Sequence, residues 1–155
     1  MTKNSFTYIS DSEQKTKELG EKLASISKRG DIFALFGTLG MGKSVLSRAF
    51  IQKLTNVEEV PSPTFTLVQG YPLKDYQIYH FDLYRLKSQE EIFELGFEEA
   101  AHNDICLIEW PQNMGSYLPA DIFSIEIIPF NNERKITISA TSPEKISRLE
   151  KLFND

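Results

Sequence analysis

The sequence predicts an α/β fold, a three-layer sandwich around a mixed β-sheet that is parallel at its centre and antiparallel toward an edge. Three observations lead to this prediction. A strand–helix unit at 31–54 lies in the first third of the chain, hairpin patterns follow it, and a further hairpin and a helix end the sequence. In addition, the run ICLIE at 105–109 is apolar until its last residue, which is typical of a central strand covered on both faces.

Helices are expected where capping signals precede regularly spaced apolar residues. The capping-box pattern S-x-x-E runs from Ser10 to Glu13 and precedes leucines that share one helical face. The same pattern recurs at 88–91. The first expected helix begins at the Ser10–Glu13 capping box and runs to about Lys28. Further helices are expected at 43–54, 88–95 and 97–102, and Ser142-Pro143 marks the start of a last one.

Strands are expected where apolar residues run continuously or alternate with polar ones. DIFALF at 31–36 is continuous and ends at a glycine, as a buried strand does. After a Pro-Ser-Pro break, alternating segments predict two strands joined by a turn near 70–75. The remaining expected strands lie at 64–68, 76–83 and 105–109, with a late hairpin formed by 122–128 and 135–140.

Composition narrows the class of protein. The 155 residues are interpreted as one domain over 1–155. No apolar run approaches the ~18 residues of a membrane span, and the first residues lack the apolar stretch of a signal peptide. A cytoplasmic location is therefore expected. Cys106 is the single cysteine, within an apolar run, and is expected to be a buried, inert thiol. One cysteine and two histidines argue against a Cys/His zinc site.

The charge balance argues against strong direct binding of nucleic acid. The chain has 17 basic and 22 acidic residues, a net charge of −5, and its lysines and arginines form no cluster. A role in nucleic-acid metabolism would therefore act through a protein partner.

The segment GTLGMGKS matches the pattern G-x-x-x-x-G-K-[ST] between an expected strand and an expected helix. Glycines allow backbone N–H groups to surround a phosphate, and the helix directs its positive end at the same site. Lys43 then contacts the β- and γ-phosphates and Ser44 is a ligand of Mg²⁺. The sequence predicts a P-loop NTPase-like fold that binds ATP or ADP with Mg²⁺ through Gly37, Thr38, Leu39, Gly40, Met41, Gly42, Lys43 and Ser44.

Such a site also needs an acidic residue, and two positions compete. Glu109 ends the most strand-like apolar run and is preferred as the metal carboxylate, directly or through water, although Asp is more usual there. Asp82 ends a second strand pattern and is expected to orient the attacking water or to contact a second metal position. A carboxylate that only accepts turn hydrogen bonds is the alternative for Asp82. The expected catalytic residues are Lys43, Asp82 and Glu109.

Four segments together resemble the bacterial TsaE (YjeE) family of tRNA threonylcarbamoyladenosine biosynthesis ATPases. They are GTLGMGKS at 37–44, SPTFTLV at 62–68, HFDLYR at 80–85 and LIEWP at 107–111. The resemblance implies an ATPase that works with two partner proteins of a threonylcarbamoyl-transferase complex. That complex modifies the adenosine beside the anticodon of tRNAs reading ANN codons, and the ATP cycle supports its turnover.

The resemblance also implies roles for particular residues. Thr64 and Thr66 lie in a segment that behaves as a nucleotide-sensitive switch, where a hydroxyl could sense the γ-phosphate; a threonine-rich start of an edge strand is the alternative. Asp82 matches the family's catalytic aspartate. The residues for which a functional and a structural role are both open are His80, Tyr84, Arg85 and Trp110.

The adenine base is expected near the chain start and the late hairpin, again from the resemblance. Glu13, Gln112 and Arg134 are the polar residues proposed to contact it, with surface positions as the alternative for each.

Three other functions remain open at this point. A small-molecule P-loop kinase would need an arginine-rich lid, whereas the five arginines here are scattered. A GTPase would need an [NT]-K-x-D segment, which the sequence lacks. An ATP-gated adaptor with negligible hydrolysis would share the phosphate-binding motif, and only activity with the partners separates it from an ATPase.

Overall fold

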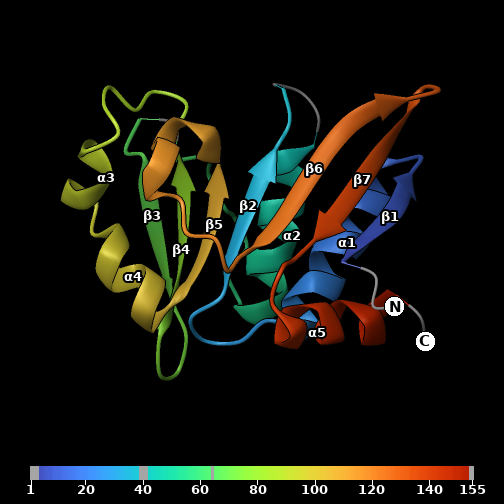
Figure 1. Cartoon of the computed structure of the whole chain (residues 1–155), viewed down its shortest axis with the longest axis horizontal. Coiled ribbons are helices and arrows are strands. Elements are labelled where there is room, and N and C mark those ends of the chain that lie inside the picture. Colours follow the sequence, from blue (N-terminus) through green and yellow to red (C-terminus); the bar gives the residue numbers. More distant parts are fainter. Residues whose placement is uncertain (1–3, 39–41, 64, 154–155) are drawn as a thin grey trace.

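The computed structural model describes residues 4–38, 42–63 and 65–153 and shows a seven-stranded sheet between two layers of helices (Figure 1). None of the helices in these residues is long and apolar enough to cross a membrane. In chain order the elements are β1 (Ser5–Ser10), α1 (Glu13–Ile26), β2 (Ile32–Phe36), α2 (Lys43–Leu54), β3 (Val68–Pro72), β4 (Gln77–Asp82), α3 (Glu91–Glu94), α4 (Phe97–Asn103), β5 (Ile105–Glu109), the 3₁₀ helix η1 (Pro111–Tyr117), β6 (Phe123–Phe130), β7 (Glu133–Ser139) and α5 (Pro143–Phe153).

The strand order is β1-β7-β6-β2-β5-β4-β3. The central strands β6, β2, β5 and β4 pair in parallel. At one edge β7 pairs antiparallel with both β6 and β1, and at the other β3 pairs antiparallel with β4. The predicted mixed sheet with a parallel centre is therefore confirmed. Antiparallel pairing occupies both edges, not one.

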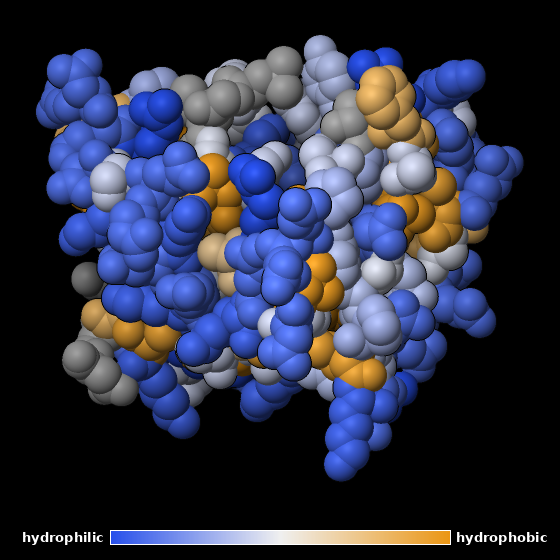
Figure 2. All heavy atoms as spheres, turned by 180° about the vertical axis from the view of Figure 1, so that it is seen from behind, coloured by the Kyte–Doolittle hydropathy of each residue, from blue (hydrophilic) through white to orange (hydrophobic). Residues whose placement is uncertain are grey.

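Each face of the sheet has its own apolar core. Side chains of β2 alternate between the faces: Phe33 and Leu35 pack toward α1, α2 and α5, while Ile32 and Ala34 pack toward α3, α4 and η1. All five residues of β5 are buried, as its continuous apolar run predicts, and Cys106 lies within it. Burial raises the pKa of the Cys106 thiol to about 12, so the thiol is protonated and unreactive at neutral pH. The surface behind the view of Figure 1 is mostly hydrophilic, with small separate apolar areas (Figure 2).

Aromatic packing fixes α2 against the centre of the sheet. The Phe33 ring stacks on Phe123 with centroids 4.7 Å apart and meets Phe50 of α2 edge-on at 5.0 Å. All three side chains are fully buried, and each such burial stabilises the fold by about 1.5–3 kcal/mol. The start of α2 is thereby held beside the carboxyl end of β2, where the glycine-rich segment connects them.

A glycine allows α1 to approach α2 closely. A Cβ at Gly20 would lie 2.5 Å from the Leu46 carbonyl oxygen, well inside van der Waals contact. This approach brings the first turn of α1 next to the first turn of α2, where two pockets described below meet.

Several predicted boundaries are wrong, and one strand was not predicted. The strand expected at 64–68 is β3 at Val68–Pro72, and the helix expected at 88–95 is the single turn of α3. Pro72 is the last residue of β3 at the edge of the sheet, where a residue without an N–H group removes no hydrogen bond to a further strand. β1 was not predicted at all, because SFTYIS has only weak alternation and gains its stability from pairing with β7.

The late hairpin is tighter than predicted. β6 and β7 extend to Phe130 and Glu133, so only Asn131 and Asn132 form the turn. Both asparagines have positive φ, 46° and 67°, as a two-residue hairpin turn of the favoured twist requires.

The N-cap of α1 is Ser12 and not Ser10. The Ser12 side chain accepts a hydrogen bond from the Lys15 N–H at 3.2 Å, whereas Ser10 ends β1 and hydrogen-bonds Thr16. The helix also ends at Ile26, two residues earlier than predicted. The capping-box pattern therefore predicted the wrong N-cap. Serine occurs at both positions, and because Ser10 is the last residue of β1, the helix begins after Ser12.

Replacing Ser12 with alanine is expected to lower the free energy of unfolding by about 1 kcal/mol, because an N–H group of the first turn of α1 loses its acceptor. Ser12→Gly is the matched variant and should cost only a few tenths of a kcal/mol, since glycine exposes that N–H to water. Urea unfolding measures both. Equal stability of the alanine variant and the parent protein would contradict Ser12 as the cap.

Candidate phosphate- and magnesium-binding site

The glycine-rich segment connects β2 to α2 and ends at Gly42. Gly42 precedes the first residue of α2 with φ 98° and ψ 11°, a left-handed conformation that glycine adopts without strain. Gly37 and Thr38 follow β2 directly. The predicted positions Leu39, Gly40 and Met41 lie outside the described residues, as does Thr64.

Lys43 is the first residue of α2, and its side chain points back across the segment. Its ammonium donates to the Gly37 carbonyl oxygen at 2.6 Å and lies 3.8 Å from the centroid of the Trp110 ring. Only 5% of Lys43 is exposed, and this burial lowers its pKa, while the nearby Glu109 and Asp82 carboxylates oppose the shift. A buried cation at a helix N-terminus is placed to meet an anion.

The predicted carboxylates end two neighbouring strands. Asp82 of β4 and Glu109 of β5 are directly paired in the parallel register, so both lie at the carboxyl edge of the sheet. The Ser44 hydroxyl lies 3.4 Å from Glu109 Oε1, and the other oxygen, Oε2, lies 2.6 Å from His80 Nε2. The structure therefore brings Ser44 and Glu109 together, as the predicted metal site requires.

Asp82 joins the site to the loop between α2 and β3. Its Oδ1 accepts from the Tyr84 N–H at 3.2 Å, and its Oδ2 lies 3.4 Å from the Ser62 hydroxyl. The Asp82 N–H donates to the Leu67 carbonyl, and Leu67 has a positive φ of 68°. This loop contains the predicted switch segment, and its exposed Thr66 is part of the same turn. A change in this loop would act directly on Asp82.

Aromatic side chains line the outer side of the site. The centroids of the Tyr84 and Trp110 rings are 4.9 Å apart, and Trp110, with φ 59°, directly precedes η1. Next to them, the Arg85 guanidinium lies 4.8 Å from the centre of the Phe65 ring, which is 84% exposed. Phe65 was not predicted as a site residue. Its position between the Pro-Ser-Pro segment and HFDLYR could have indicated that it lies near the site.

These groups enclose one pocket of about 420 Å³ at the N-terminus of α2. Ser62 also lines this pocket, although it was not predicted as a site residue. Its position between two prolines, in the segment next to the predicted switch, could have indicated it. The lining residues are Gly42, Lys43, Ser44, Val45, Ser62, Asp82, Tyr84, Arg85, Glu109 and Trp110.

The donors fit magnesium that arrives with a nucleotide. Ser44 and Glu109 offer the hard oxygen ligands that Mg²⁺ prefers. Within residues 4–38, 42–63 and 65–153, no group of three acidic, histidine or cysteine side chains is arranged to hold a metal alone. Mg²⁺ commonly takes one or two protein oxygens and fills its shell with water and phosphate oxygens, which suits this arrangement.

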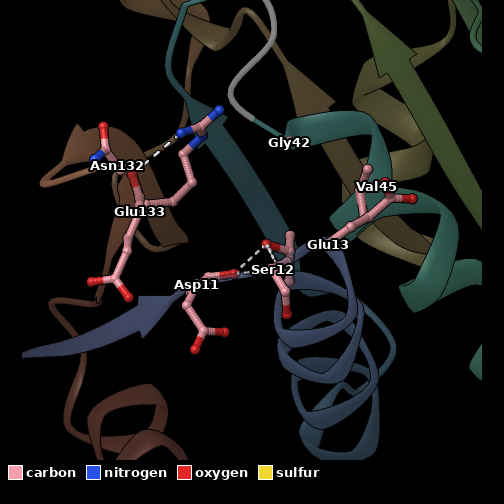
Figure 3. Close-up of a pocket in the computed structure, with 10 residues that line it drawn as sticks. Asp11, Ser12, Glu13, Gly42, Val45, Asn132 and Glu133 are labelled. Atoms are coloured by element: carbon pink, nitrogen blue, oxygen red, sulfur yellow. Dashed lines mark hydrogen bonds between the residues drawn. The ribbon is translucent and has the colours of Figure 1, made fainter.

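A second pocket of about 280 Å³ lies on the other side of the start of α2 (Figure 3). Glu13 at the start of α1 and Arg134 of β7 both line it, together with Asn132 and Glu133 from the hairpin. It shares Gly42 and Val45 with the first pocket, so the two adjoin. Gln112 is exposed in η1 and is not among the described residues that line it.

The fold and the site define the class of protein: a P-loop NTPase-like α/β sandwich with acidic residues at the ends of two parallel strands. The family model described as "Threonylcarbamoyl adenosine biosynthesis protein TsaE" matches residues 10–136. The chain belongs to the TsaE family, and the resemblance seen in the sequence is confirmed.

Relatives match over most of their length. A Rickettsia conorii protein named "tRNA threonylcarbamoyladenosine biosynthesis protein TsaE" is 37% identical over 145 residues, covering 93% of this chain and 83% of its own. The Bacillus subtilis protein of the same name is 32% identical over 149 residues, covering 91% and 93%. The crystal structure of Bacillus subtilis YdiB superposes with a TM-score of 0.79 at 26% identity, covering 99% of this chain and 97% of that one.

Proposed function

We propose that this protein is the ATP-binding and ATP-hydrolysing component of the complex that makes N6-threonylcarbamoyladenosine next to the anticodon of tRNAs reading ANN codons. The names of the family and of its relatives support the pathway. The nucleotide chemistry is supported by one observation: Lys43, Ser44, Asp82 and Glu109 line a single pocket at the N-terminus of α2.

Phosphate binding follows from the start of α2. The N–H groups of a first helical turn have no partner within their helix and carry partial positive charge, which favours a phosphate. Lys43 adds a full charge, and its ammonium lies against the Trp110 ring, which lines the same pocket. In this proposal the Lys43 ammonium contacts the β- and γ-phosphates in front of the first turn of α2.

Hydrolysis is assigned to the residues at the strand ends. The magnesium ion supplies charge neutralisation at the phosphate oxygens. Ser44 and Glu109 hold the metal position, and Asp82 accepts a hydrogen bond from the attacking water and so orients it. Because Asp82 also contacts Ser62, hydrolysis at the phosphates can change the conformation of the loop before β3.

The adenine base is proposed to occupy the smaller pocket, between Glu13 and Arg134 (Figure 3). A nucleotide bound in both pockets would cross Gly42 and Val45, which the pockets share. Gln112, predicted for the same role, is not among the described residues that line this pocket and is left out of the proposal.

The proposed partners are two proteins of the threonylcarbamoyl-transferase complex in the cytoplasm, with no strong direct contact to nucleic acid. The net charge of −5 supports an indirect route to tRNA. Turnover that depends on the partners is then expected, because the switch loop lies at the surface beside the pocket.

Phosphate release from ATP, measured for the isolated protein and with its two partners, tests the proposal. We expect Mg²⁺-dependent hydrolysis that the partners increase. Unchanged, negligible hydrolysis in the complete complex would favour the ATP-gated adaptor. Transfer of the γ-phosphate to a small hydroxylated acceptor faster than to water would favour a kinase.

A further inference from the structure

We propose, resting on the function above, that His80 is a positioning residue: it fixes the Glu109 carboxylate so that one oxygen faces Ser44 at the magnesium position. His80 does not line the pocket itself. It acts through Glu109, from one layer further into the protein.

The contact between the His80 and Glu109 side chains is short and buried. His80 Nε2 lies 2.6 Å from Glu109 Oε2, and His80 and Glu109 are 1% and 3% exposed. The proposal places the hydrogen on His80 Nε2, because a carboxylate that is ionised, as a magnesium ligand is, only accepts hydrogen bonds. A charge-assisted hydrogen bond inside the protein is stronger than one at the surface.

The sheet explains why His80 reaches Glu109. His80 precedes Asp82 by two residues on β4, so both side chains leave the same face. Asp82 is paired with Glu109 on β5, which makes His80 and Glu109 diagonal neighbours on that face. Two rigid parallel strands therefore set the distance, and no loop movement is needed to form the contact.

Fixing one carboxylate oxygen determines where the other one points. The terminal torsion of glutamate is broad, so a free carboxylate would rotate. With Oε2 held by His80, Oε1 is directed to the Ser44 hydroxyl, 3.4 Å away. Residues that orient metal ligands in this way typically change metal affinity or activity by about 10- to 100-fold when removed.

A purely structural role for His80 predicts a different result. In that case its loss would reduce stability and weaken nucleotide and metal binding together. The positioning role predicts a selective loss of metal affinity, with nucleotide affinity in the absence of metal unchanged. A matched pair of variants separates these outcomes, because the glutamine side chain reaches as far as imidazole Nε2 and the asparagine side chain does not.

The test uses His80→Gln and His80→Asn, with the exposed His102→Asn of α4 as the control. Mn²⁺ binding to the protein–ADP complex is followed by electron paramagnetic resonance, and a fluorescent ADP analogue reports nucleotide affinity in EDTA. We expect the Mn²⁺ Kd to rise about tenfold in His80→Asn and less than threefold in His80→Gln. Nucleotide affinity in EDTA should stay within about twofold of the parent protein in both.

Equal Mn²⁺ affinity in His80→Asn and the parent protein overturns the positioning role and leaves the ATPase proposal standing. Failure of the parent protein to bind ADP and Mn²⁺ overturns both. If neither variant folds, nitrogen-15 NMR of the parent protein decides, because its two histidines give separable imidazole signals. A hydrogen on His80 Nε2 supports the proposal, and one on Nδ1 alone overturns it.

Discussion

Replacing Glu109 with glutamine is expected to slow ATP hydrolysis by roughly 100- to 1,000-fold while the nucleotide Kd stays within about threefold. The substitution keeps the volume of the side chain but removes the charge beside Ser44. Interactions that develop in the transition state are lost, whereas the phosphate contacts of α2 and Lys43 remain. Phosphate release and fluorescent-nucleotide titration measure the two quantities separately.

Glu126→Gln is the matched control for this variant. Glu126 is an exposed glutamate of β6, outside both pockets, and its replacement should leave hydrolysis and binding unchanged. Turnover of Glu109→Gln at the parent rate would remove Glu109 from the mechanism. A parallel loss of binding and hydrolysis would mean that Glu109 shapes the pocket and has no separate part in the chemical step.

Replacing Lys43 with alanine is expected to weaken nucleotide binding by roughly 10- to 100-fold, because a hydrogen bond to a charged group contributes about 1.5–3 kcal/mol. Lys43 is a buried cation at the N-terminus of α2 and lines the same pocket as Glu109 and Asp82. Calorimetric titration with ADP and Mg²⁺ measures the effect.

Lys43→Met separates charge from packing. The Lys43 side chain also packs against Trp110, and methionine keeps most of that contact without the charge. We expect Lys43→Met to bind nucleotide as weakly as Lys43→Ala. If the methionine variant instead bound like the parent protein, the stem of Lys43 and not its ammonium would be the important part.

Local pattern predicted the central fold well. The strand at 105–109 and the helix at 43–54 have the predicted bounds, since a continuous apolar run and a regular apolar spacing define them without help from the rest of the chain. The prediction missed β1 and placed β3 too early in the chain. Both are edge strands, whose positions depend on pairing with β7 and β4 respectively. The buried Arg148–Asp31 ion pair, 2.6 Å long, joins α5 to the start of β2 across 117 residues, and no local pattern reveals it.

The candidate site was predictable where a motif or a strand end marks a residue. Lys43, Ser44, Asp82 and Glu109 were singled out in this way, and the structure places them around one pocket. The contact of His80 with Glu109 depends on the register of β4 against β5, which the sequence leaves open.

Calorimetric titration of the protein with ATP and Mg²⁺ tests the central claim most directly. The account predicts heat of association with one nucleotide per chain, and loss of that heat when the ligand is AMP, which lacks the β- and γ-phosphates. Absence of any heat at millimolar ATP and Mg²⁺ would contradict it.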